Sequence, residues 1–235
     1  MQRLYIFISV SAYLFLPMFY TVKIPWVIRK LYPTLIWEKP TDEKIIYLTF
    51  DDGPHPTATN FVLDQLKGFN AKATFFCIGK NVVELTDFYK RIIEEGHKLG
   101  NHTFNHVNGW KTNNEKYIAD IYKAAQYIDS NLFRPPYGRI TKFQIALLQK
   151  QETEKTEMFT EQRQRFDIIM WTVLSGDFDE KLSPEKCLQH VLLNTKPGSI
   201  VVFHDSAKAW DRLYFALPKV LEHFSKEGFA FRALV

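Results

Sequence analysis

The stretch that most constrains this chain is residues 45–54, IIYLTFDDGP, in which an apolar run ends in two adjacent carboxylates. The run predicts a buried strand over Ile45–Phe50, and Gly53-Pro54 predicts the turn that stops it. Side chains alternate along extended backbone, so Asp51 and Asp52 should point in different directions. One carboxylate could then bind a metal while the other acts on a bound water. The alternative is a turn with two solvated acids, and these ten residues favour neither.

Length and composition restrict the class of protein. A chain of 235 residues with 46% hydrophobic residues can bury one large core or two small ones. A net charge of +4 without a dense basic stripe argues against a nucleic-acid-binding protein. The two cysteines, Cys77 and Cys187, do not make a disulfide framework, and Cys77 lies in a strand-like run where packing is its expected role.

Residues 4–22 form a nearly charge-free stretch that is interrupted by Pro17. It is long enough for a marginal transmembrane helix, and it fits a signal peptide less well because no small-x-small cleavage site follows. Lys and Arg are more frequent after the stretch than before it, which would hold the main domain in the cytoplasm. A third interpretation is that translation starts at Met18.

The expected organisation has three parts. Residues 1–22 are an apolar segment that serves as a membrane anchor, a signal or a misassigned start. Residues 23–44 are an arm that packs aromatic side chains onto the domain, and residues 45–235 are one catalytic domain. The protein is membrane-anchored or in the cell envelope if residues 4–22 are real, and cytoplasmic otherwise.

From residue 45 onward, strand-like and helix-like segments alternate, which predicts an α/β fold with a parallel sheet covered by helices. Residues 151–165 are charged and polar, and we expect them to extend the preceding helix on the surface. The expected strands are 45–50, 72–77, 98–100, 132–133, 167–172, 199–203 and 230–234. The expected helices are 57–67, 87–95, 114–131, 141–149, 184–194 and 211–226.

Polar clusters follow several of these strands. His102 and His106 are spaced so that both imidazoles can face one metal if the segment is helical or tightly turned. Together with Asp52 they would form a His-His-carboxylate set that leaves positions open for water and substrate. Two histidines on a polar loop can also have no such role.

Three more residues are candidates for chemistry. Arg134 enters a loop stiffened by two prolines, where its guanidinium could hold a carboxylate bidentately, although an ordinary turn explains the loop as well. Asp177 follows a strand and is flanked by aromatic residues. His204 ends a strongly apolar strand, where it could do acid–base work or simply cap the strand end.

Taken together, these residues resemble the polysaccharide deacetylase family, the NodB-like homology domain of carbohydrate esterase family 4, from about residue 45 to residue 234. The motifs at residues 49–54, 102–106 and 134–138 are intact. The fourth motif, Asp-x-x-Asp-Trp, has Leu174 for its first Asp and Phe178 for its Trp. The fifth, Leu-x-His, begins at Val202. These departures fall on the substrate-pocket wall and affect acyl and sugar specificity more than the chemistry.

The resemblance implies a distorted (β/α)7-type barrel with a single catalytic domain. It implies a hydrolase that removes N-linked acetyl groups from N-acetylated sugars or polysaccharide, using one divalent metal, zinc or a similar ion such as cobalt. Asp52, His102 and His106 would bind the metal, and Asp51 would be the general base. An N-acetylated carbohydrate is the expected partner, no nucleic acid is expected, and membrane association through residues 4–22 is possible.

Roles for the remaining residues also follow from the resemblance. Arg134 would orient Asp51 and keep it ionised, the backbone N–H of Tyr137 would stabilise the oxyanion, and His204 would protonate the leaving amine with help from Asp177. Alternatives that keep the same site are a deformylase or deacylase of a lipid-linked amino sugar and an O-acetyl esterase. A non-catalytic sugar-binding module is the alternative from another class. The residues expected to contact substrate are Pro136, Phe178 and Val202.

Overall fold

The computed structural model describes residues 21–150 and 164–235, and the statements below concern these residues. Predictions for residues 1–20 and 151–163 lie outside them. Within the described ranges, no helix combines the length and apolar composition needed to cross a bilayer. Residues 23–44, expected to be irregular, contain the short helix α1 (Trp26–Leu31) and bury Leu35 and Trp37 in the core.

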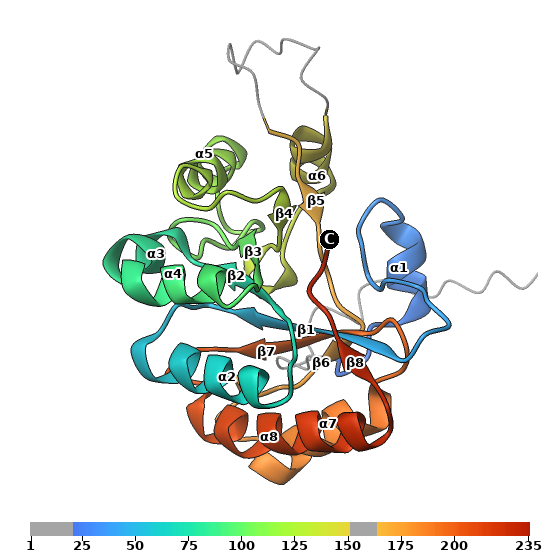
Figure 1. The fold of residues 1–235 in the computed structure, drawn as a ribbon. Coiled ribbons are helices and arrows are strands. Elements are labelled where there is room, and N and C mark those ends of the chain that lie inside the picture. The colour runs from blue at the N-terminus through green and yellow to red at the C-terminus, as the bar shows by residue number, and fades with distance from the viewer. Residues whose placement is uncertain (1–20, 151–163) are drawn as a thin grey trace, which may run out of the picture.

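The architecture is a single curled sheet of parallel strands with helices packed around it (Figure 1). The sheet order is β5-β4-β3-β2-β1-β7-β6, and β8 pairs with the start of β1. The sheet forms an open half-barrel whose edge strands are β5 and β6, which confirms the predicted fold class. The strands in the described residues are β1 (Ile45–Asp51), β2 (Thr74–Cys77), β3 (Lys98–Asn101), β4 (Leu132–Phe133), β5 (Asp167–Ile168), β6 (Val173–Leu174), β7 (Ile200–His204) and β8 (Ala230–Phe231).

Helices cover the outside of the curled sheet. In Figure 1, α7 and α8 lie below β7 and β1, α3 and α4 lie beside β2, and α5 and α6 lie above β3 and β4. The helices that follow β1 in the described residues are α2 (Pro56–Gly68), α3 (Gly79–Glu84), α4 (Thr86–Glu94), α5 (Asn114–Ala125), α6 (Lys142–Gln149), α7 (Pro184–Asn194) and α8 (Trp210–Lys226).

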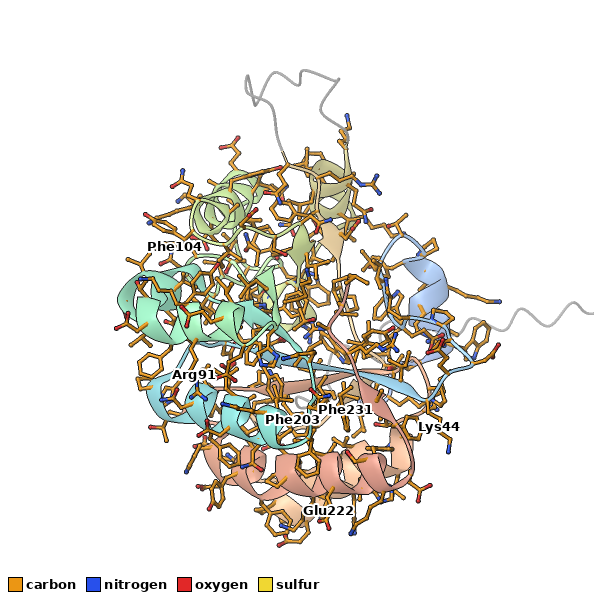
Figure 2. All side chains as sticks on the ribbon, viewed as in Figure 1. Lys44, Arg91, Phe104, Phe203, Glu222 and Phe231 are labelled. Atoms are coloured by element: carbon orange, nitrogen blue, oxygen red, sulfur yellow. The ribbon has the colours of Figure 1, made fainter. Side chains whose placement is uncertain are left out.

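Successive side chains of β1 point alternately to the outer face of the sheet, beneath the helices, and to its inner, concave face. Ile46, Leu48 and Phe50 belong to the large buried cluster beneath the helices, whereas Tyr47 belongs to a second cluster inside the curl. Figure 2 shows Phe203 and Phe231 between the strands and α8, with Glu222 on the outer side of that helix. The same alternation places Asp51 on the inner face, at the carboxyl end of the central strand.

Most predicted elements agree with the structure to within two residues at each end. Besides α1, the exceptions are β8, which ends at Phe231 rather than at residue 234, and the three described next. The strand expected over 167–172 is only β5 at Asp167–Ile168, and a separate strand, β6, begins at Val173. The backbone N–H groups of residues 169, 170 and 172 instead bond to the carbonyls of Phe133, Ile36 and Ile200, respectively. Helix α5 ends at Ala125 rather than at residue 131, because Ser130 donates its hydroxyl to Leu99 O (2.6 Å) and leads the chain into β4. The unpredicted helix α3 begins with a glycine and is fixed by a tertiary bond from Gly79 N–H to Thr103 O.

Candidate active site

The two aspartates at the end of β1 point in different directions, as predicted. Asp51 is 4% exposed on the inner face of the sheet. Asp52 has a φ of 79°, a left-handed conformation that turns its carboxylate away from that of Asp51. The side-chain amide of Asn81 donates to Asp52 O (2.8 Å) and supports this turn.

Asp52, His102 and His106 come together as the spacing of the motif predicts. One ligand atom from each lies within 4.8 Å of the other two, with Asp52 Oδ1 3.1 Å from His106 Nε2 and 3.6 Å from His102 Nε2. Asp52 Oδ1 is buried without a hydrogen bond of good geometry. His102 Nδ1 bonds to Arg134 O (2.8 Å), which leaves Nε2 directed at the cluster. These residues therefore fit a divalent metal.

Protonation states in the cluster also suit metal binding. Burial lowers the pKa of His102 to about 4, so its imidazole is neutral at physiological pH. Burial alone would raise the pKa of Asp52, but the approach of His106 Nε2 to Oδ1 (3.1 Å) and the positive charge of His204 hold this pKa well below its usual value. A neutral imidazole and an ionised carboxylate are the forms in which these side chains ligate metals.

Arg134 is fully buried and holds Asp51 in place. Its Nη1 donates to Asp51 Oδ1 and to Thr49 Oγ1, both at 2.7 Å. Its remaining donors reach the backbone carbonyls of Ile169 (3.2 Å) and Met170 (3.1 Å). Four of the five guanidinium N–H groups are therefore engaged within the protein, which holds Arg134 rigid and fixes the position of the Asp51 carboxylate.

His204 ends β7, the strand next to β1, and its Cα is the partner of that of Asp51 in the sheet register. Asp177 accepts hydrogen bonds from the backbone N–H and from Nδ1 of His204, both at 2.7 Å. Burial alone would lower the pKa of His204, but the charge and hydrogen bond of Asp177, with charges from Asp52 and Asp51, raise it to about 9. His204 is therefore a cation at neutral pH with Nδ1 committed to Asp177.

The predicted substrate-contacting residues lie around these groups. Tyr137 is 62% exposed, has a φ of 59°, and its ring lies 4.7 Å from that of His106. The ring of Phe178 meets that of His204 edge to face at 5.2 Å. Val202 lies on the same face of β7 as His204 and is buried, as is Pro136.

Sequence reasoning missed three residues that shape the site. Asp205 is fully buried, accepts a hydrogen bond from Thr59 Oγ1 (2.5 Å), and packs so closely on Gly53 that any side chain there would overlap it. Arg212 is buried and donates Nε–H to Asp177 O (2.6 Å). Thr49 shares the guanidinium of Arg134. The sequence could have indicated Asp205, because it directly follows the last residue of a strand, just as Asp52 does. Arg212 could not have been found in this way, because only the fold brings it to Asp177.

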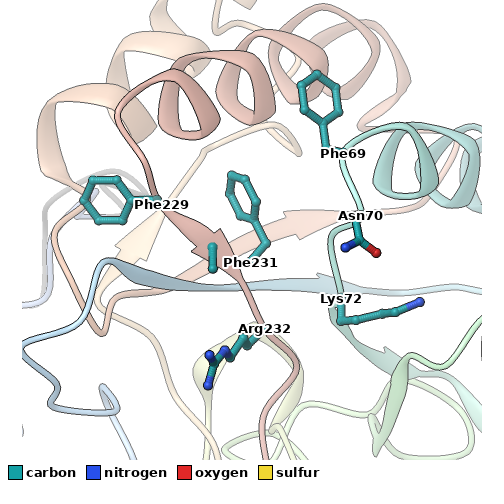
Figure 3. A pocket seen from close by; sticks show the side chains of 7 residues that line it. Phe69, Asn70, Lys72, Phe229, Phe231 and Arg232 are labelled. Carbon is teal, nitrogen blue, oxygen red and sulfur yellow. The ribbon is translucent and has the colours of Figure 1, made fainter.

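A cavity of about 480 Å³ lies elsewhere, lined mainly by Phe69, Lys72, Phe229, Phe231 and Arg232 (Figure 3). Strand β8, which contributes to its wall, pairs with the first residues of β1, so the cavity lies at the opposite end of that strand from Asp51. Its lining contains no imidazole or carboxylate side chain. We therefore place the chemistry at the carboxyl ends of the strands, as is usual for βα-barrels.

Comparison with known proteins agrees with this arrangement. The family model described as polysaccharide deacetylase matches residues 38–154. A peptidoglycan-N-acetylglucosamine deacetylase of Bacillus cereus is 35% identical over 86% of this chain and 93% of that protein. A chitooligosaccharide deacetylase of Azorhizobium caulinodans is 29% identical over 82% of this chain and 94% of that protein. A crystal structure of a peptidoglycan N-acetylglucosamine deacetylase in complex with 4-naphthalen-1-yl-N-oxidanyl-benzamide has a TM-score of 0.73 and 30% identity, covering 90% of this chain and 95% of that one. The chain therefore belongs, as its motifs predict, to the polysaccharide deacetylase family of hydrolases.

Proposed function

We propose that this chain is a metal-dependent deacetylase that hydrolyses the acetamido group of N-acetylglucosamine residues in a glycan. The observation that carries the proposal is the meeting of a His-His-Asp cluster, a carboxylate held by a buried arginine, and a protonated histidine at one end of the sheet. The acetamido sugars in the names of two relatives, peptidoglycan N-acetylglucosamine and chitooligosaccharide, support this substrate class.

Asp52, His102 and His106 would hold one divalent metal. Two imidazoles and one carboxylate form a ligand set that suits zinc and leaves positions open to water and substrate. When bound, such an ion would polarise the amide carbonyl and acidify a nearby water. The hydrogen bond between His102 Nδ1 and Arg134 O orients the imidazole so that Nε2 is available to the metal.

The residues around the cluster would divide the proton transfers between them. Asp51, fixed by Arg134, would accept a proton from the water that attacks the carbonyl carbon. The backbone N–H of Tyr137 would stabilise the oxyanion. His204 would donate its proton to the amide nitrogen as the carbon–nitrogen bond breaks, releasing acetate and the free amine. Asp177 holds the His204 ring in position for this step.

Metal removal and single substitutions test the proposal together. Acetate release from a tetramer of N-acetylglucosamine should stop after dialysis against a chelator and return when zinc or cobalt is added. His102→Ala should lose both the stoichiometric metal, measured by elemental analysis, and the activity. His223→Ala is the matched control, because His223 is exposed near the end of α8 and should keep both properties.

Two results would contradict the proposal. Full turnover by protein that elemental analysis shows to be metal-free would remove the metal from the mechanism. A His102→Ala protein with one tightly bound ion per chain and normal turnover would show that the ligands have been assigned wrongly.

A further inference from the structure

Trp110 is unusually exposed for its size and stands in the loop that follows the proposed ligand His106. Its side chain is 58% exposed, whereas large aromatic residues are mostly buried. It lies four positions after His106, so the two Cα atoms are at most about 14 Å apart. A glycan whose acetamido group reached the metal cluster could therefore also reach Trp110 with a neighbouring sugar.

The indole of Trp110 is held rigidly in this exposed position. Its Nε1–H donates to Ile140 O (3.0 Å), and its backbone N–H donates to Asn108 Oδ1 (3.0 Å). The preceding residue, Gly109, packs against Arg139 O so closely that a Cβ would overlap it. This contact joins the loop that carries His106 to the loop that carries Arg139. We call the Trp110 indole, held between these two loops, the platform.

Arg139 supplies a charge on this platform. Its guanidinium carbon lies 4.2 Å from the centre of the Trp110 ring, an arrangement typical of a cation–π contact. The residue is exposed, and no carboxylate within the described ranges forms an ion pair with it. Arg139 lies two residues after Tyr137, whose ring contacts His106. A planar guanidinium in this setting is suited to bidentate recognition of a carboxylate.

We propose that Trp110 and Arg139 form an additional subsite for a carboxylate-bearing sugar residue next to the one being deacetylated. The inference rests on the proposed deacetylase function and names its preferred substrate, an anionic glycan rather than a neutral one. The exposed indole supports the apolar face of the neighbouring sugar ring, and Arg139 binds the carboxylate. The carboxylate could be carried by the sugar itself or by an attached peptide.

The test compares kcat/KM for four substrates of the zinc-loaded enzyme. They are the N-acetylglucosamine monomer, the neutral tetramer, an alternating N-acetylglucosamine and N-acetylmuramic acid tetramer with free lactyl carboxylates, and the same tetramer carrying peptides. We expect Arg139→Gln to lower kcat/KM by roughly tenfold on an anionic tetramer and not on the neutral one, as for one lost charge-assisted hydrogen bond. The anionic substrate that responds identifies the source of the carboxylate.

Trp110→Ala tests the platform itself. It should raise KM for every tetramer by about tenfold and leave the monomer unchanged, because the monomer has no neighbouring sugar to occupy the subsite. Matched controls are Trp26→Ala and Arg232→Gln, which change equally exposed residues outside the site and should have no effect. The same loss on neutral and anionic tetramers in Arg139→Gln, or no loss in either variant, would overturn the subsite. Inactivity of the wild type on all four substrates would instead count against the deacetylase function.

Discussion

The Asp177 carboxylate binds His204 twice, through the backbone N–H and through Nδ1, each at 2.7 Å. Asp177 thus fixes both the backbone at the end of β7 and the orientation of the His204 imidazole. Arg212 fixes Asp177 in turn by donating to its carbonyl oxygen. A histidine restrained in this way has its second nitrogen, Nε2, left for substrate, and its charge is stabilised before substrate arrives.

The first prediction concerns the alkaline limb of the pH–rate profile. His204 must be protonated to serve as the proposed acid, and its pKa of about 9 lies above its ordinary value of 6.5. Activity should therefore persist through neutral pH and fall by about tenfold per pH unit above pH 9. Asp177→Asn removes the largest contribution that raises this pKa, so it should move the limb towards lower pH. If the alkaline limb of the pH–rate profile lay at the same pH in wild type and Asp177→Asn, His204 would not be the general acid.

The second prediction separates the base from the metal ligands. Asp51→Asn keeps the shape of the side chain, but the amide cannot accept a proton from water. Metal stoichiometry should stay at the wild-type value while kcat falls by about 10²–10⁴-fold, the usual contribution of a general base. Loss of metal in Asp51→Asn would show that Asp51 is a ligand, and normal kcat would show that another group is the base.

A third prediction concerns stability at the buried ion pair. Arg134→Gln leaves the Asp51 carboxylate buried without its cation and removes the donors that Arg134 gives to the carbonyls of Ile169 and Met170. We expect the free energy of unfolding to fall by about 3–5 kcal/mol, as for other buried pairs broken on one side. Arg91→Gln, which breaks partly exposed pairs with Asp64 and Glu95, should cost only about 1 kcal/mol. Urea denaturation of both variants measures the difference, and equal losses would contradict the assignment.

The candidate site could be predicted from the sequence because most of its residues lie at strand ends, where local pattern and chemistry coincide. Asp51, Asp52 and His204 all follow apolar runs, and strand alternation predicts that the two carboxylates diverge. The left-handed backbone of Asp52, which the sequence did not predict, contributes to that divergence. Arg212 illustrates what local pattern does not reveal. It lies within α8, 35 residues from Asp177, and only the packing of that helix against the sheet brings the two together.

Helix α3 shows a second limit of sequence reasoning. Its residues include a leading glycine and two valines, which have weak helix propensity. The helix forms because Ile78 N–H bonds to Gly53 O and Gly79 N–H bonds to Thr103 O, so tertiary contacts override local preference. Asn81 on this helix then supports Asp52, which makes a segment without a motif part of the site's scaffold.

A fourth prediction follows from Asp205. Burial, with the nearby charges of Asp52 and Asp51, raises its pKa from 3.8 to about 8. Between these values the folded state keeps a proton that the unfolded state has lost, so this group destabilises the metal-free fold as pH rises from 4 to 8. Asp205→Asn removes the titration, so its stability relative to wild type should improve steadily across that range. A constant difference in unfolding free energy from pH 4 to pH 8 would contradict the raised pKa.

The last prediction concerns acyl specificity. Phe178 stands where the family motif has Trp, and its ring meets His204 edge to face. If Phe178 lines the acyl pocket as proposed, its smaller ring widens that pocket, and a hydrophobic pocket distinguishes one methylene by only about 1–3 kcal/mol. We therefore expect acetyl to be preferred, propionyl to be tolerated, and Phe178→Trp to increase the ratio of kcat/KM for acetyl over propionyl glucosamine oligomers.

A neighbouring tryptophan could instead fill the space that Phe178 leaves, in which case acyl specificity would not depend on Phe178. Trp210 contacts Phe61 and Tyr214 in the helix layer, so it is engaged away from His204. Trp171 lies against Gly138, where a Cβ would come within 2.6 Å of its ring, so it could line the pocket from the opposite loop. Trp171→Phe is therefore the informative second variant. If Phe178→Trp leaves the acetyl-to-propionyl ratio unchanged while Trp171→Phe lowers it, selectivity resides in Trp171 and the Phe178 assignment is wrong.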